Sequence, residues 1–132
     1  MTIEARLENS GATHHVLVST NAAAKQLAVP AKNEGRGSAI NGGEFLATAI
    51  ATCFCNDIYR EAIRRKIEVR SITVHVTSIF GGEGDPAKEI VYSVKIDSPA
   101  SESEINKLIH DVDKIAEIHN TLRRGIDVTL RV

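Results

Sequence analysis

The sequence has few cysteines, almost no net charge and no long apolar run. Its 132 residues include 2 cysteines, and the formal net charge at pH 7 is −1. Two cysteines that stand two positions apart cannot build the disulfide framework of a small secreted domain. Positive charge gathers only in short clusters at 64–66 and 123–124. This distribution argues against a nucleic-acid partner.

The longest apolar run covers residues 45–55 and is interrupted only by Thr48 and Thr52. It is too short to span a bilayer, and the N-terminal stretch lacks the apolar segment of a signal peptide. We therefore expect a cytoplasmic protein with reduced thiols and no membrane partner. Apolar residues make up 42% and charged residues 25% of the chain, so we expect one globular domain over 1–132.

The first half of the sequence predicts three strands and a long helix. Residues 2–8 alternate apolar and charged side chains, 14–20 are rich in β-branched residues, and 25–30 form a third short run. A polar, Gly-rich loop follows, and 43–66 then predict one helix whose first half is apolar nearly all round. Such a helix must be covered on all faces. In so short a chain, we expect the second subunit of a homodimer to supply part of that cover.

The second half predicts a hairpin, a helix and a closing strand. Residues 69–80 and 89–96 alternate around the turn sequence GGEGDP. Ser101 and Glu104 form a capping box for a helix over 98–117. Residues 125–132 alternate again, as a strand does. The order βββ-α-ββ-α-β predicts an α+β fold with a mainly antiparallel sheet.

Cys53 and Cys55 end the apolar run, and the pattern alone favours two core cysteines. An ordinary thiol is mostly protonated at pH 7, and apolar surroundings raise its pKa further. Cys53 is far from the positive end of its helix, and Asp57 one turn later would oppose a thiolate. Positions i and i+2 of a helix point apart, so the two thiols cannot form a disulfide unless the helix unwinds.

Motifs for metals, nucleotides and phosphates are missing from the sequence. None of the histidines and cysteines have a zinc-finger spacing, and GGEG lies in a turn that does not lead into a helix. We therefore expect no metal and no cofactor, and a metal site assembled from distant positions stays an open alternative.

Two segments carry a family resemblance. EFLATAIATC runs from Glu44 to Cys53 after a Gly-rich loop, and the chain ends in IAEIHNTLRRGIDVTL. Together they resemble the OsmC/Ohr family, named for osmotically induced protein C and organic hydroperoxide resistance proteins. The resemblance implies an intertwined homodimer with centrally buried long helices. It also implies peroxiredoxin-like, thiol-dependent reduction of organic hydroperoxides and hydrogen peroxide in oxidative-stress defence.

In that family, peroxide oxidises one cysteine to a sulfenic acid, a second cysteine condenses with it, and a dithiol reopens the disulfide. Cys53 matches the first cysteine. The second cysteine would fall at Ala116 and the following proline at Glu117, so neither is present. Likewise, the family's activating Glu falls at Gly43, with Glu44 beside it.

An arginine also activates the family's thiol, because a cation beside sulfur favours the thiolate. Arg36 in the loop before the helix is the nearest candidate here, and Arg6 and Arg70 are weaker ones. His119 lies one helical turn past Ala116 and could act as a cation or base near Cys53.

Two functions therefore stay open. Cys53 could be the thiol of a one-cysteine peroxidase that uses an external thiol reductant. Alternatively, the dimer could hold a small hydrophobic molecule without turnover, in an apolar cleft lined by Phe45, Ile50, Cys53, Phe54 and Ile118. A third alternative makes Cys55 the reactive thiol.

Overall fold

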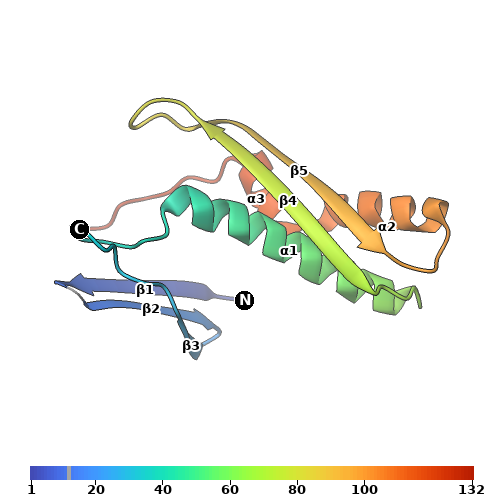
Figure 1. The fold of residues 1–132 in the computed structure, drawn as a ribbon, viewed down its shortest axis with the longest axis horizontal. Coiled ribbons are helices and arrows are strands. Elements are labelled where there is room, and N and C mark those ends of the chain that lie inside the picture. The colour runs from blue at the N-terminus through green and yellow to red at the C-terminus, as the bar shows by residue number, and fades with distance from the viewer. Residues whose placement is uncertain (12) are drawn as a thin grey trace. The chain divides into compact units, whose positions relative to one another are not determined.

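The computed structural model describes residues 1–11 and 13–132. The chain divides into two compact units, residues 1–45 and 46–132, and each unit is described by itself (Figure 1). The class is α+β with antiparallel strands, as predicted. The prediction of one domain over 1–132 stays a prediction.

The first unit is built on a three-stranded antiparallel sheet. Its strands are β1 (Ile3–Ser10), β2 (Thr13–Thr20) and β3 (Ala23–Leu27), paired in the order β1-β2-β3. These strands confirm the three predicted runs. The turn into β3 contains Asn21 and Ala22, which both have positive φ, at 47° and 67°. This left-handed pair matches the twist of the two strands that it joins.

Helix α1 (Gly42–Arg64) confirms the predicted long helix. At its start, the side chains of Asn41 and Glu44 cap each other's backbone. The backbone N–H of Glu44 donates to Asn41 Oδ1 at 2.9 Å, and the backbone N–H of Asn41 donates to Glu44 Oε2 at 2.7 Å. These bonds satisfy donors that a helix N-terminus leaves without partners. Its buried apolar residues repeat every fourth position, and they are Ile50, Phe54, Ile58 and Ala62.

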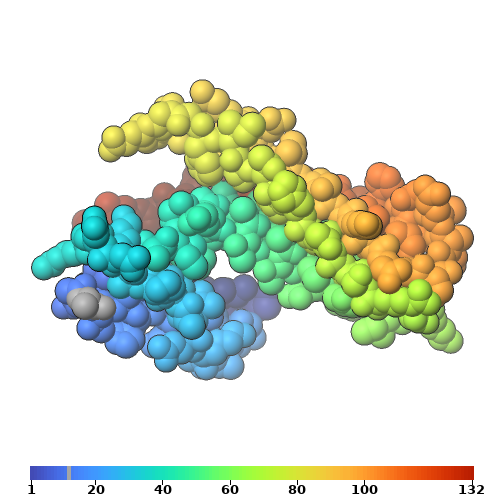
Figure 2. Space-filling model, viewed as in Figure 1, coloured from blue at the N-terminus to red at the C-terminus, as the bar shows by residue number. Residues whose placement is uncertain are grey.

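The predicted hairpin is also confirmed, as β4 (Ser71–Phe80) and β5 (Ala87–Asp97). Val74 pairs with Val94 and Val76 with Tyr92, and alternate residues of both strands are half-buried against the core. The turn between the strands stands out from the surface of this unit (Figure 2). Glycine is needed at position 81 of this turn, because the Cβ of any other residue would clash with Asp85 Oδ2 at 2.4 Å.

The second predicted helix is two helices in the structure. Helix α2 (Glu102–Ile115) begins at the predicted capping box, with Ser101 as N-cap and Glu104 as its partner. It ends at Ala116, whose extended backbone (φ −63°, ψ 111°) interrupts the helical run, and α3 (Glu117–Arg124) follows. Ala116 is fully buried in the core that α1, α2 and the hairpin share.

A polar contact holds α3 against the hairpin. The hydroxyl of Tyr92 on β5 donates to Asp113 Oδ1 on α2, and Arg123 on α3 donates to the same oxygen. Arg123 also donates to the Asp113 carbonyl at 2.9 Å. Burial, followed by the Asp113 carboxylate, raises the pKa of Tyr92 well above its usual range. The phenol therefore stays protonated and keeps its donor role at physiological pH.

The predicted closing strand over 125–132 is wrong for this structure. These residues follow α3 without strand pairing, and their apolar side chains are exposed, with Val128 100% and Leu130 85% accessible. The alternation is that of a strand, but a strand needs a neighbour to satisfy its backbone. Separately, no helix in the described residues is long and apolar enough to cross a membrane.

Candidate active site

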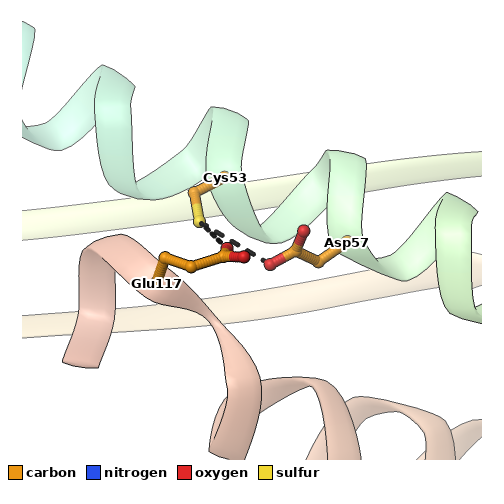
Figure 3. A group of neighbouring side chains, drawn as sticks. All are labelled: Cys53, Asp57 and Glu117. Carbon is orange, nitrogen blue, oxygen red and sulfur yellow. Dashed lines mark hydrogen bonds between the residues drawn. The ribbon is translucent and has the colours of Figure 1, made fainter. Parts of the chain in front are cut away.

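Cys53 faces two carboxylates where α1 meets α3 (Figure 3). Asp57 follows Cys53 by one turn of α1, and its Oδ2 accepts a hydrogen bond from the thiol at 3.7 Å. Glu117, the first residue of α3, places Oε2 at 4.0 Å from the same sulfur. The thiol and two carboxylates therefore form one small group of side chains.

The break at Ala116 positions α3 for this contact. The first amides of a helix have no intrahelical acceptor and take partners from outside. In α3, the backbone N–H of Ile118 lowers the pKa of the Cys53 thiol. The helix start thus supplies a donor that stabilises a thiolate, whereas the carboxylates beside it oppose one.

On balance the pKa of the Cys53 thiol is raised above its ordinary value of 9.0. Burial is the largest cause, and the charges of Asp57 and Glu117 add to it, while the Ile118 amide acts in the opposite direction. At neutral pH Cys53 is therefore a protonated thiol. Within the second unit, the charged groups that contact its sulfur are both carboxylates.

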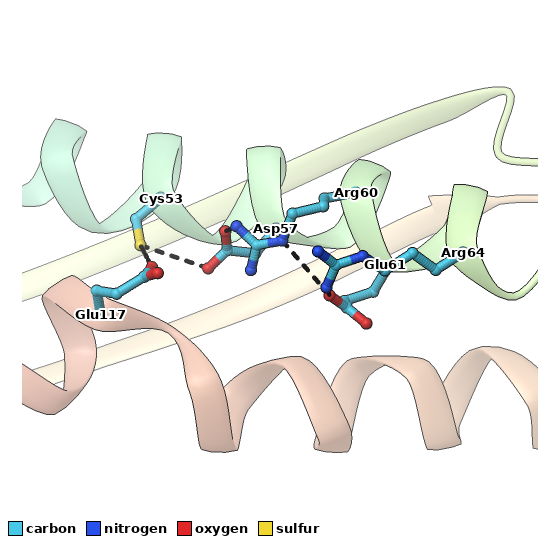
Figure 4. Close-up of polar contacts among 6 residues, drawn as sticks. All are labelled: Cys53, Asp57, Arg60, Glu61, Arg64 and Glu117. Atoms are coloured by element: carbon cyan, nitrogen blue, oxygen red, sulfur yellow. Dashed lines mark hydrogen bonds and ion pairs between the residues drawn. The ribbon is translucent and has the colours of Figure 1, made fainter. Parts of the chain in front are cut away.

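Asp57 belongs to a chain of ion pairs along α1 (Figure 4). Its side chain is buried, and Oδ1 pairs with Arg60 Nη1 at 2.7 Å. Arg60 continues to Glu61, which also binds Arg64 at 2.6 Å. Burial is the main cause of a raised pKa at Asp57, Arg60 opposes it, and Glu117 adds to it.

The sulfur of Cys53 and one carboxylate oxygen each of Asp57 and Glu117 lie within 4.8 Å of one another. Both carboxylates therefore lie within hydrogen-bonding distance of the thiol. Thiol and carboxylate are also ligand types for divalent metals. Glu117 is exposed, however, and exposed carboxylates often gather without an ion, so we assign no metal to the group.

Replacing Asp57 by asparagine is expected to lower the pKa of Cys53. The substitution keeps the shape of the side chain and removes one negative charge that disfavours the thiolate. Below the thiol pKa, the iodoacetamide reaction rate of Cys53 should rise on the order of threefold to tenfold, because the thiolate is the reacting form. The measurement is the pH dependence of alkylation at Cys53, followed by mass spectrometry.

Glu61→Gln is the matched control, because Glu61 is also buried on α1 but has no hydrogen bond with Cys53 in the described chain. It should leave the alkylation profile nearly unchanged. An unchanged or slower reaction in Asp57→Asn would contradict the electrostatic role assigned to Asp57.

His119 is buried between aromatic rings. Its ring centroid lies 4.7 Å from that of Tyr92 and 5.5 Å from that of Phe54. Burial, with Arg123 adding to it, lowers the pKa of His119, although Asp113 and Asp57 oppose the shift. Its nitrogens make no hydrogen bond within the described chain. A neutral ring favours the role of base over that of cation, and either role at Cys53 stays a prediction.

Arg36 and Glu44, the other predicted site residues, belong to the first unit. Arg36 is exposed in the loop before α1, and Glu44 forms the capping contact with Asn41. Their predicted roles toward Cys53 stay predictions. The weaker candidates Arg6 and Arg70 form exposed ion pairs, with Glu8 and with Glu68 and Asp97.

The sequence anticipated Asp57 beside Cys53 but not Glu117. The position of Asp57 beside Cys53 follows from helical spacing, since residues i and i+4 lie on the same face of a helix. Glu117 stands 64 positions from Cys53, so only the packing of α3 brings them together. One signal was available: Glu117 directly follows Ala116, where the family resemblance places a cysteine that reaches Cys53.

Cys55 lies in different surroundings. It lines a shallow surface pocket with Ala51, Thr52, Asn56 and Val74. Both cysteines are free thiols. Their separate environments agree with the helical geometry that points positions i and i+2 apart.

Comparisons with known proteins identify the family. The model of the OsmC-like protein family matches residues 35–131. The chain therefore belongs to the OsmC-like family. A comparison with curated protein sequences gives no match.

Solved structures share the fold. An OsmC-like protein from Mycoplasma pneumoniae is similar with a TM-score of 0.65 and 21% identity, covering 91% of this chain and 87% of that one. An organic hydroperoxide resistance protein OsmC from Legionella pneumophila has a TM-score of 0.60 and 24% identity, covering 98% and 95%. The organic hydroperoxide resistance protein OhrB of Bacillus subtilis has 0.56 and 16%, covering 98% and 96%.

Proposed function

We propose that this protein reduces organic hydroperoxides or hydrogen peroxide through the single thiol of Cys53, in defence against oxidative stress. The observation that supports this most is the placement of the Cys53 sulfur. It is only partly buried, the Ile118 amide lowers its pKa, and the thiol donates a hydrogen bond to Asp57 Oδ2. A thiol with a proton acceptor and an external donor can release its proton when it reacts. Membership of the OsmC-like family agrees with this chemistry.

The chemical steps balance without a second protein cysteine. The sulfur of Cys53 attacks the outer oxygen of the peroxide, the O–O bond breaks, and an alcohol or water leaves with the thiol proton. The product at Cys53 is a sulfenic acid. Two molecules of an external thiol then reduce it, giving water, a disulfide of the external thiol and the restored Cys53.

An external reductant is needed because Ala116 stands where a resolving cysteine would be. Ala116 is fully buried, and the other cysteine of the chain lines a separate surface pocket. We therefore propose a small thiol or dithiol as the second substrate.

Trapping the sulfenic acid tests the proposal. The reduced protein is mixed with excess cumene hydroperoxide and a sulfenic-acid probe, and the labelled residue is mapped by mass spectrometry. Rapid labelling of Cys53 is expected. Labelling no faster than that of a free thiol would overturn the peroxidase proposal.

The second candidate is a binding protein for a small hydrophobic molecule, without turnover. The observation that favours it is the raised pKa of Cys53, which makes the thiol less reactive at neutral pH. In this case Cys53→Ser and Cys55→Ser should both keep the affinity for the ligand.

We also propose that the protein works as a homodimer, because the first half of the long helix is apolar nearly all round and must be covered on all faces. The exposed apolar residues after α3 support this, because a second copy could cover them. Val128→Lys should weaken dimerisation at least about tenfold, since a charge would have to be buried. Thr129→Lys, on the opposite face of the alternating run, should keep the dimer.

Sedimentation equilibrium measures the dissociation constants of these variants. A monomeric wild-type protein at all concentrations, or equal losses in Val128→Lys and Thr129→Lys, would refute this dimer.

A further inference from the structure

His119 is buried without a hydrogen bond where α3 packs on its neighbours. Its side chain is 6% exposed, and it lies against the rings of Phe54 on α1 and Tyr92 on β5. Both ring nitrogens have almost no accessible surface and no hydrogen-bond partner among the described residues. The docked helix therefore holds a basic side chain that has lost its hydration and gained no polar contact in return.

Charged groups on three helices act on His119. Asp57 on α1 and Asp113 on α2 favour a protonated ring, whereas Arg123 on α3 opposes one. Each of these carboxylates already forms an ion pair with an arginine. The facing group from β5, the Tyr92 phenol, is uncharged at physiological pH. Burial is the largest influence, and it places the pKa of His119 below its ordinary value.

Polar contacts with α2 hold α3 in its position. Arg123 donates to the carbonyl and to the carboxylate of Asp113. The Asn120 side chain donates to the Lys114 carbonyl at 3.0 Å. His119 is the buried residue of α3, so docking of this helix and removal of the ring from water are one event. A proton that the ring accepts only in water therefore favours the released helix.

We propose that His119 is a pH-dependent latch for α3, and that protonation of its ring at mildly acidic pH releases the helix from α1, α2 and β5. Above about pH 6.5 the ring is neutral in both the docked and the released helix, so docking has its full strength. Below that value the released helix binds a proton that the docked helix does not. The ratio of released to docked helix then rises up to about tenfold per pH unit. The latch acts beside the candidate active site, and it does not depend on whether Cys53 reduces peroxides.

Amide hydrogen exchange of the whole chain between about pH 7.5 and about pH 5 measures the release. The backbone N–H of Asn120 is the probe, because it donates to the Ala116 carbonyl at 2.9 Å in the docked helix. Its protection factor, which corrects for the intrinsic pH dependence of exchange, is expected to fall on the order of tenfold across this range. At each pH it should stay below the protection factors in the middle of α2, since release of α3 is local.

Variants at two histidines separate the latch from a general effect of acid. His119→Leu has no titratable group, so its α3 protection should no longer fall as the pH is lowered. His119→Gln, which cannot titrate either, should behave alike and replaces the leucine variant if that one does not fold. His110→Leu, at an exposed position of α2, should keep the wild-type fall.

Four results would each overturn the latch. They are a wild-type α3 protection that does not fall, equal protection in α2 and α3, a fall that survives both changes at His119, and the loss of the fall in His110→Leu.

Discussion

Cys53→Ser is expected to abolish peroxide consumption, whereas Cys55→Ser is expected to retain it. Serine keeps the size of the side chain but has no sulfur that peroxide can oxidise. Cys53 is the thiol that donates a hydrogen bond to Asp57 and whose pKa the Ile118 amide lowers. Removing the nucleophile should lower the rate at least about a hundredfold. The measurement is the loss of cumene hydroperoxide with a dithiol in excess.

Cys55→Ser is the matched control for this experiment, since it changes a neighbouring thiol on another face of α1. A loss confined to Cys55→Ser would move the reactive thiol to residue 55. Full activity in both variants would exclude a thiol mechanism and favour the binding function.

Phe54→Ala should cause the largest loss of stability among single core changes in the second unit. Phe54 is fully buried, and its ring makes an edge contact with Tyr92 at 5.0 Å between centroids. Truncating such a side chain costs about 3–5 kcal/mol, from lost burial and the cavity left behind. Because a domain's whole stability is only about 5–15 kcal/mol, the variant should be near the limit of folding.

Urea denaturation at a fixed protein concentration measures this effect. Ile63→Ala, at a position on the same helix that is 77% exposed, should change the free energy of unfolding by about 0.5 kcal/mol or less. Similar midpoints for the two variants would contradict the core assigned to the second unit.

The elements that periodicity defines could be predicted from the sequence. The alternation around GGEGDP gives the β4–β5 hairpin, and the capping box places the start of α2, because local chemistry determines both. The break at Ala116 could not be predicted, since no proline or glycine marks it there. Its extended backbone accompanies burial of the alanine in the core, which is a tertiary effect.

Residues 125–132 show the reverse case, in which the sequence pattern predicts an element that the structure does not contain. Their alternation is typical of a strand, but these residues pair with no strand in this structure, and an alternating pattern alone does not show whether a neighbouring strand exists. The candidate site also has a part that the sequence predicts and a part that it does not. Cys53 and Asp57 follow from helical spacing, whereas Glu117 and the Ile118 amide depend on how α3 packs.

The shortness of α3 has a consequence for access to Cys53. At 8 residues, α3 is below the length at which an isolated helix is stable in water. It persists because Tyr92, Asp113 and Arg123 hold it against its neighbours. The amides of α3 should therefore exchange with solvent through local opening, well before global unfolding. Each opening would remove Glu117 and the Ile118 amide from the sulfur together, so the reactivity of the thiol would fluctuate with the opening and closing of this single helix.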